Sequence, residues 1–206
     1  MKKRIILVGY RATGKTTLAV KLGKILGWPS LDTDPLIEEV AGEAEISQDL
    51  IQARISKVEL IEKKAGKSIT QIFAENGEAY FRELEAQVVV EVLRETAPLV
   101  LATGGGVPLR ADSRKLLRNS GVVFWLQACP KTIYSRINKD KTSGSRRPAL
   151  TDLGPIQEIE ELLKKRDSAY RSTAHYILDT ENLSLDQLCD RVLALYKEKE
   201  LEENQK

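Results

Sequence analysis

The segment Gly9–Thr16 has the residue types and spacing that point most directly to chemistry. It reads GYRATGKT and matches the pattern G-x-x-x-x-G-K-[ST], directly after the apolar run Arg4–Val8. Its glycines allow the backbone to curl so that successive N–H groups point into one concavity, where a following helix adds positive character. Lys15 would reach the β- and γ-phosphates of a nucleotide, and the Thr16 hydroxyl would take one position around Mg²⁺. An ordinary glycine turn would leave Lys15 unexplained, so we predict a nucleotide-binding loop.

Two carboxylates stand two residues apart, at Asp32 and Asp34, at the end of another short apolar run. Alternate residues of an extended chain point the same way, so both carboxylates can project from one strand end. Ligands of open α/β sheets bind at the carboxyl ends of the strands. One aspartate would hold Mg²⁺ through water, and the other would accept a proton from an acceptor hydroxyl. Helix capping before Pro35 is an alternative for Asp34, but it does not account for Asp32.

Two arginines lie in helical segments where their charge needs a partner. Glu78, Arg82 and Glu85 share one helical face, and Val89 continues the same stripe. A row of surface ion pairs is the simple interpretation of that face. Arg166 interrupts an apolar helical stripe, and an arginine that faces a core requires an anionic partner. That partner is either a ligand carboxylate or a structural salt bridge. Two arginines from separate helices could also clamp one carboxylate between them.

Two loops add candidate residues. Thr103–Gly106 reads TGGG after an apolar run, and three glycines at a strand end allow the backbone to approach a ligand closely. Residues 139–154, KDKTSGSRRPALTDLG, form a polar stretch between two helical segments. The stretch is either a solvated loop or a lid, because long loops inside compact domains are often functional. Arg147 within it would offer a mobile cation to a transferring phosphoryl group.

These candidate residues fall near the ends of short apolar runs that alternate with amphipathic segments. The alternation predicts an α/β fold in which a five-stranded parallel sheet has helices on both faces. The predicted strands are Arg4–Val8, Ser30–Leu31, Leu99–Ala102, Val122–Leu126 and Tyr176–Leu178. The predicted helices are Thr16–Leu26, Gly77–Glu95, Ala111–Arg118, Lys131–Asn138, Pro155–Thr173 and Ser184–Lys197, and residues 197–206 are expected to fray.

The composition limits the class of protein. The 206 residues are 42% hydrophobic and 30% charged, which is enough apolar material for a packed core. A formal net charge of +2 argues against nucleic-acid binding through bulk charge, and no apolar stretch approaches the ~20 residues of a membrane span. The two cysteines, Cys129 and Cys189, suit a reducing cytosol, and with one histidine they form no zinc ligand set. We therefore expect a cytoplasmic protein with no membrane or nucleic-acid partner. We also expect it to be a monomer.

The order of the motifs resembles that of the shikimate kinase family over nearly the whole chain. The resemblance rests on the phosphate loop, LDTD at 31–34, GKSITQIF at 66–73, GEAYFRELE at 77–85, TGGG at 103–106, Arg147-Pro148, and Lys165-Arg166 with Tyr170. It implies an enzyme that uses ATP to phosphorylate the 3-hydroxyl of shikimate, in chorismate and aromatic amino-acid biosynthesis. It also implies a three-layer P-loop kinase fold of the nucleoside monophosphate kinase type, with a helical acceptor-binding segment and a lid loop.

The resemblance further implies roles for individual residues. Shikimate and ATP would be the small-molecule partners, with Mg²⁺ as cofactor. The implied catalytic residues are Lys15, Asp34 and Arg147. Those implied to bind ATP are Ala12, Thr13, Gly14, Lys15, Thr16, Thr17 and Arg147, and those implied to bind Mg²⁺ are Thr16 and Asp32. Shikimate would contact Asp34, Arg82, Gly105 and Arg166, with both arginines on its carboxylate, Glu85 orienting Arg82, and Arg136 near the adenine.

One stretch departs from the family pattern. Between the LDTD and GKSITQIF motifs this chain is longer than the family usually is, and the extra length equals the offset at which residues 36–43 resemble residues 60–67. Both chance similarity and a segmental duplication would explain this echo. We expect one kinase domain over residues 1–206, with an acceptor-binding segment at 34–96 that includes an extra helix near 44–65.

Two other functions are compatible with the motifs. If the extra helix reshapes the acceptor site, the chain is a kinase for another small hydroxy acid, such as gluconate. A P-loop module that binds nucleotide without phosphoryl transfer is the non-enzymatic alternative. Asp34 and Arg147 argue against the module, because a nucleotide sensor needs neither an acceptor base nor a lid cation.

Overall fold

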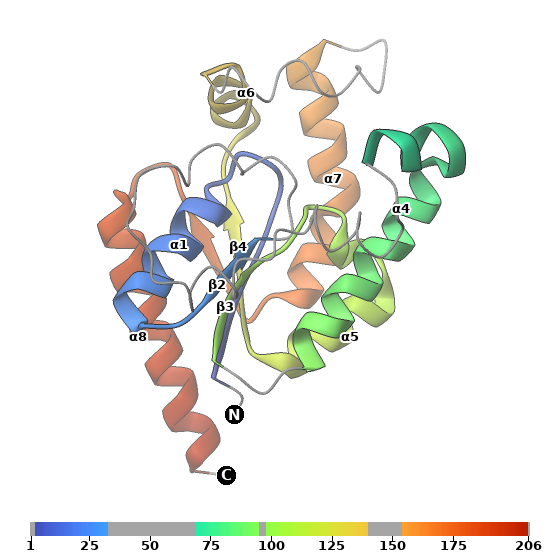
Figure 1. Ribbon diagram of the computed structural model, residues 1–206. Helices are drawn as coiled ribbons and strands as arrows, with labels where there is room; N and C mark the ends of the chain where they lie inside the picture. The colour runs from blue at the N-terminus through green and yellow to red at the C-terminus, as the bar shows by residue number, and fades with distance from the viewer. Residues whose placement is uncertain (1–2, 33–68, 95–97, 140–153, 206) are drawn as a thin grey trace.

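The computed structural model describes residues 3–32, 69–94, 98–139 and 154–205. Five parallel strands form one sheet in the order β2-β3-β1-β4-β5 (Figure 1). The strands are β1 (Arg4–Val8), β2 (Ser30–Asp32), β3 (Leu99–Ala102), β4 (Val122–Gln127) and β5 (Tyr176–Asp179). The predicted five-stranded parallel sheet is confirmed, and β2, β4 and β5 each extend one residue beyond the predicted end.

Helices follow the strands, as the alternation of the sequence predicts. They are α1 (Lys15–Leu26), α4 (Ile69–Arg94), α5 (Ala111–Ser120), α6 (Pro130–Lys139), α7 (Pro155–Thr173) and α8 (Leu185–Asn204). A short 3₁₀ helix, η1 (Val107–Leu109), follows the TGGG loop and was not predicted.

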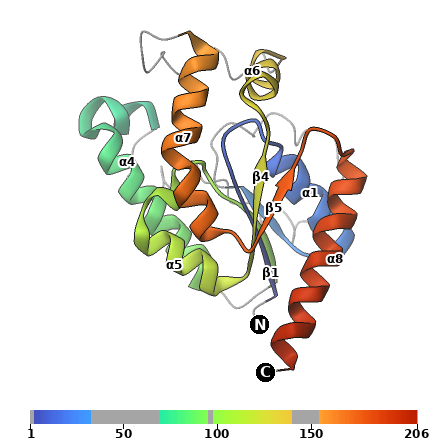
Figure 2. The ribbon, with the colours of Figure 1, turned by 180° about the vertical axis from the view of Figure 1, so that it is seen from behind.

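The core lies on both faces of the sheet. Successive side chains of β1 alternate between the faces: Ile5 and Leu7 pack with α1 and α8, whereas Ile6 and Val8 pack with α4, α5 and α7. A strand that is buried on both faces reads as a continuous apolar run, which is the pattern of β1. Figures 1 and 2 show the two helical layers from opposite sides. The three-layer arrangement is therefore the predicted one.

Helix α6 lies beyond the carboxyl ends of the strands instead of covering a face of the sheet (Figure 1). A separate apolar cluster joins it to α7, and in that cluster Ile133 and Ile159 pack with Tyr10. Tyr10 belongs to the phosphate loop, so this cluster connects the loop to both helices.

Two helix boundaries differ from the predicted ones. Helix α8 continues to Asn204, so the expected fraying from residue 197 is wrong. The polar residues there are good helix formers, and Lys199 and Glu202 form an ion pair at 3.1 Å. Helix α4 begins at Ile69, and Gly77, the predicted start, is instead a non-helical kink between its two parts.

Several predictions concern residues outside the described ranges. These are the extra helix near 44–65, most of the lid at 139–154, Asp34 and Arg147. Among the helices that are described, none combines the length and the apolar character needed to cross a lipid bilayer.

Candidate functional site

The sheet order brings three of the predicted segments to one edge. Strands β2, β3 and β1 are neighbours, and their carboxyl ends lead to Asp32, Thr103–Gly106 and the phosphate loop, respectively. The candidate residues on these segments therefore come together although they lie far apart in the sequence.

The phosphate loop turns sharply between β1 and α1. Gly9 has a φ of +144°, and a Cβ there would lie 2.5 Å from the carbonyl oxygen of Leu126, so only glycine fits. Gly14 precedes the first residue of α1, and its carbonyl oxygen accepts a hydrogen bond from the Leu18 N–H at 3.0 Å. The predicted ATP-binding residues Ala12, Thr13 and Gly14 lie in the loop, and Thr17 lies in the first turn of α1.

Lys15 is held inside the loop, where the residue is only 4% exposed. Its Nζ donates a hydrogen bond to the carbonyl oxygen of Tyr10 at 2.7 Å, and the Thr13 hydroxyl donates to the same oxygen at 2.8 Å. The lysine ammonium is therefore oriented within the concavity and not toward bulk solvent.

Thr16 and Asp32, the two residues predicted to hold Mg²⁺, contact each other. The Thr16 hydroxyl donates a hydrogen bond to Oδ2 of Asp32. A hydroxyl and a carboxylate are hard oxygen donors of the kind that Mg²⁺ prefers, and Mg²⁺ sites in phosphoryl-transfer enzymes use few protein ligands besides the substrate phosphates. The donor chemistry at this position therefore fits Mg²⁺.

Arg82 lies against the TGGG loop and is held by two carboxylates. Its Nη1 donates to Glu85 Oε2 at 2.9 Å, and its Nη2 donates to Glu78 Oε1 at 2.9 Å. The Glu85 side chain is only 2% exposed, whereas Glu78 lies largely in solvent. A Cβ on Gly106 would approach Arg82 Nη1 to 2.6 Å, so the guanidinium occupies the space that a side chain at position 106 would need.

Arg166 reaches the same loop from α7. Its Nη1 lies 3.5 Å from the Gly105 carbonyl oxygen, which accepts a shorter bond, 2.7 Å, from the Tyr170 hydroxyl. Burial raises the pKa of Tyr170, and the positive charges of Arg166 and Arg82 act in the opposite direction. The charges of both guanidinium groups therefore act on one hydroxyl, and these groups lie at the neighbouring glycines 105 and 106.

The sequence left two partners open for Arg166, a ligand carboxylate and a structural salt bridge. In the described parts of the chain no aspartate or glutamate forms an ion pair with Arg166. Its contacts are the Gly105 carbonyl, Tyr170 and the ring of Tyr10.

Arg136 connects the phosphate loop to the loop after β5. Its guanidinium donates to the Ala12 carbonyl at 3.3 Å and to the carbonyl and hydroxyl oxygens of Thr180 at 2.9 and 3.1 Å. The predicted place of Arg136 beside a nucleotide base is compatible with this position, because the residue borders the phosphate loop. Thr180 was not predicted, since nothing in its sequence context distinguishes it from an ordinary turn threonine.

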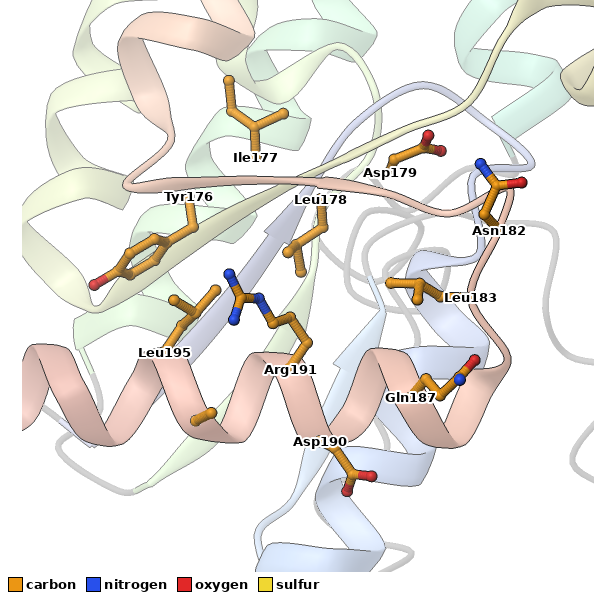
Figure 3. Close-up of a pocket in the computed structure, with 11 residues that line it drawn as sticks. Tyr176, Ile177, Leu178, Asp179, Asn182, Leu183, Gln187, Asp190, Arg191 and Leu195 are labelled. Atoms are coloured by element: carbon orange, nitrogen blue, oxygen red, sulfur yellow. The ribbon is translucent and has the colours of Figure 1, made fainter.

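Two cavities open on the described part of the molecule. One, of about 550 Å³, borders Tyr10 and Thr13 of the phosphate loop and extends to α7 and the end of β5. The other, of about 660 Å³, lies between the edge strand β5 and helix α8, where Arg191 is among its lining residues (Figure 3). None of the predicted site residues lines the second cavity, so it is separate from the candidate site.

Comparisons with known proteins agree with this geometry. A family model described as shikimate kinase matches residues 57–197. The chain is 38% identical to a shikimate kinase of Oleidesulfovibrio alaskensis, over 86% of this chain and 88% of the relative. It is 35% identical to a shikimate kinase of Rhodopirellula baltica, over 93% and 89% of the two chains.

A solved structure extends the similarity to three dimensions. A shikimate kinase from Acinetobacter baumannii in complex with shikimate is 33% identical, with a TM-score of 0.74 over 97% of this chain and 95% of that one. Its identity and coverage agree with those of the sequence relatives, so sequence and fold point to the same family. The chain belongs to the shikimate kinase family.

Proposed function

We propose that the chain transfers the γ-phosphoryl group of ATP to the 3-hydroxyl of shikimate and releases shikimate 3-phosphate and ADP, a reaction of aromatic amino-acid biosynthesis. The observation that carries the proposal is the pair of guanidinium groups at Gly105 and Gly106, beside the phosphate loop. An acceptor that bears a carboxylate would be held there by two cations while its hydroxyl faces the nucleotide.

The two arginines would do different parts of this work. Arg82 is fixed by Glu78 and Glu85, so its orientation is set before a substrate binds. Arg166 has no such carboxylate among the described residues and keeps its donors available for a ligand. Two planar donors of fixed geometry match a carboxylate better than lysines would, because each guanidinium can form two parallel hydrogen bonds.

On the nucleotide side, the loop backbone and Lys15 would hold the phosphates of ATP. Thr16 and Asp32 would hold Mg²⁺, which supplies positive charge to the β- and γ-phosphate oxygens when bound. Lys15 would add a second positive charge from within the loop.

Two further roles rest on the sequence, because the residues lie outside the described ranges. Asp34, two residues after Asp32, would accept the proton of the 3-hydroxyl as that oxygen attacks the γ-phosphorus. Arg147 would place its cation against the transferring phosphoryl group. Together with the two-arginine clamp, Lys15 and the Mg²⁺ ligands, these roles would make up a single transfer step.

The proposal is tested by measuring ADP release with ATP and Mg²⁺ and with one acceptor at a time: shikimate, shikimate methyl ester, gluconate, or none. We expect rapid release with shikimate, with ³¹P NMR showing a new phosphate ester, and poor turnover of the uncharged methyl ester. Faster turnover of gluconate would show a different hydroxy-acid kinase. Nucleotide binding with no acceptor-dependent ADP release would show a binding module and overturn the proposal.

A further inference from the structure

Tyr10 is the second residue of the phosphate loop, but its ring is buried. The residue is 4% exposed, and its ring packs with Ile133 of α6 and Ile159 of α7. Aromatic side chains are not part of the phosphate-loop pattern, which depends on glycines, a lysine and a hydroxyl. The ring therefore needs an explanation other than phosphate binding.

The guanidinium of Arg166 lies over this ring. The Arg166 Cζ atom is 5.4 Å from the ring centroid of Tyr10, within the range of a cation–π interaction. The nearest backbone acceptor, the Gly105 carbonyl, is 3.5 Å from Nη1, at the long limit of a hydrogen bond. The Tyr10 ring is thus a third fixed contact of the guanidinium, beside the Gly105 carbonyl and Tyr170, for a cation that lacks the carboxylate partners of Arg82.

We infer that Tyr10 is a positioning residue that holds Arg166 in the orientation that receives the acceptor carboxylate. The inference rests on the proposed function. An arginine side chain without a fixed partner samples many rotamers, and each must be given up when a carboxylate binds. A ring that favours one orientation before binding reduces that loss and strengthens binding of the acceptor.

The backbone of Tyr10 has a separate role that a substitution would leave in place. Its carbonyl oxygen accepts the hydrogen bond from Lys15, and every residue type keeps this carbonyl. Removing the ring should therefore weaken the acceptor side and spare the nucleotide side. A purely structural role would affect both.

The experiment compares Tyr10→Leu and Tyr10→Phe with the unaltered chain in steady-state kinetics. We expect Tyr10→Leu to raise KM for shikimate by about threefold to tenfold, the size of a cation–π contact at such a site. KM for ATP should change less than about twofold, within the range of substitutions that remove no contact. Tyr10→Phe keeps the ring and should restore the KM for shikimate.

Tyr134→Leu is the matched control, because Tyr134 packs on the same cluster of α6 and α7 without a ring contact to Arg166. It should leave both KM values unchanged. Arg11 also lies near the Tyr10 ring, with its Cζ 5.9 Å from the centroid, so a second comparison isolates Arg166. In an Arg166→Ala background, Tyr10→Leu should have no additional effect on the KM for shikimate.

The outcomes separate this inference from the proposed function. If the unaltered chain does not phosphorylate shikimate, the proposed function itself is wrong. If it does, but Tyr10→Leu leaves KM for shikimate unchanged, raises both KM values equally, or has the same effect with and without Arg166, then Tyr10 does not position Arg166. Urea unfolding of each variant shows whether the compared proteins are folded.

Discussion

Lys15 has its ammonium group inside the phosphate loop, where burial and the Tyr10 carbonyl fix its position. A positive charge held in advance stabilises developing negative charge without the cost of reorienting solvent. We predict that Lys15→Ala lowers kcat by at least about a hundredfold, as loss of one such group does elsewhere. Lys24→Ala, at the exposed end of the same helix, is the control and should retain full activity. Near-normal turnover of Lys15→Ala in the ADP-release assay would contradict the assignment of the loop.

Replacing Arg82 and replacing Arg166 should affect the stability of the fold differently, although the two arginines share one proposed ligand. Replacing either by alanine removes a charge-assisted contact of about 1.5–3 kcal/mol, so KM for shikimate should rise by roughly one to two decades. Arg82→Ala also breaks the ion pair with the buried Glu85, which should lower the free energy of unfolding by roughly 1–3 kcal/mol. Arg166→Ala breaks no described ion pair and should leave stability within about 1 kcal/mol. Steady-state kinetics and urea unfolding of both variants check this. Equal losses of stability would argue that both arginines, and not Arg82 alone, support the fold.

At the scale of the element, α4 changes direction at Gly77. The residue has a φ of 77° and a ψ of 175°, a conformation that is nearly restricted to glycine. A Cβ there would meet no atom within 4 Å, so the cost of Gly77→Ala is backbone strain and not a clash. We predict a loss of about 1–3 kcal/mol in the free energy of unfolding. Gly27 ends α1 in the left-handed conformation, which asparagine tolerates. Gly27→Asn should therefore cost less than about 1 kcal/mol. Equal effects of the two substitutions in urea unfolding would contradict the strain argument.

The elements were more predictable from sequence than the contacts between them. Strand β1 was predicted at its observed bounds because a strand buried on both faces is a continuous apolar run. Helix α7 was predicted because its stripe keeps a helical spacing on both sides of Arg166. The kink at Gly77 was not predicted as a kink, since helical sequence continues on both sides of it.

In the candidate site too, features that depend on local sequence were predictable, whereas a contact between distant segments was not. The phosphate loop, Asp32 and Arg82 were predictable because their chemistry depends on local spacing: a loop pattern, a strand end, one helical face. The contact between Tyr10 and Arg166 was not, because it joins a loop at one end of the chain to a helix near the other. The one indication in the sequence was an aromatic residue within the phosphate loop. The packing of that residue against α6 and α7 explains why its ring is buried.

At the scale of the whole molecule, the only histidine of the chain links two strands of the sheet. The Nδ1 atom of His175 accepts a hydrogen bond from the Val123 N–H at 3.0 Å, and the His175 N–H donates to the Val123 carbonyl at 2.8 Å. The imidazole must be neutral at Nδ1 to accept this bond. Burial lowers its pKa to about 4, and the positive charges of Arg118 and Lys199 act in the same direction.

This low pKa predicts how the stability of the fold depends on pH. An unfolded chain protonates His175 near pH 6.5, whereas the folded chain resists protonation down to about pH 4. Between these values the unfolded state binds more protons, so the free energy of unfolding should fall as the pH drops. The imidazole is only partly buried, and solvent screening reduces the effect to an order of 1–2 kcal/mol. His175→Asn keeps an oxygen that can accept the Val123 N–H but cannot titrate, so its stability should vary less from pH 7 to 5. Parallel urea unfolding curves measure this, and identical pH slopes for the two proteins would show that His175 does not control the stability of the fold in this range.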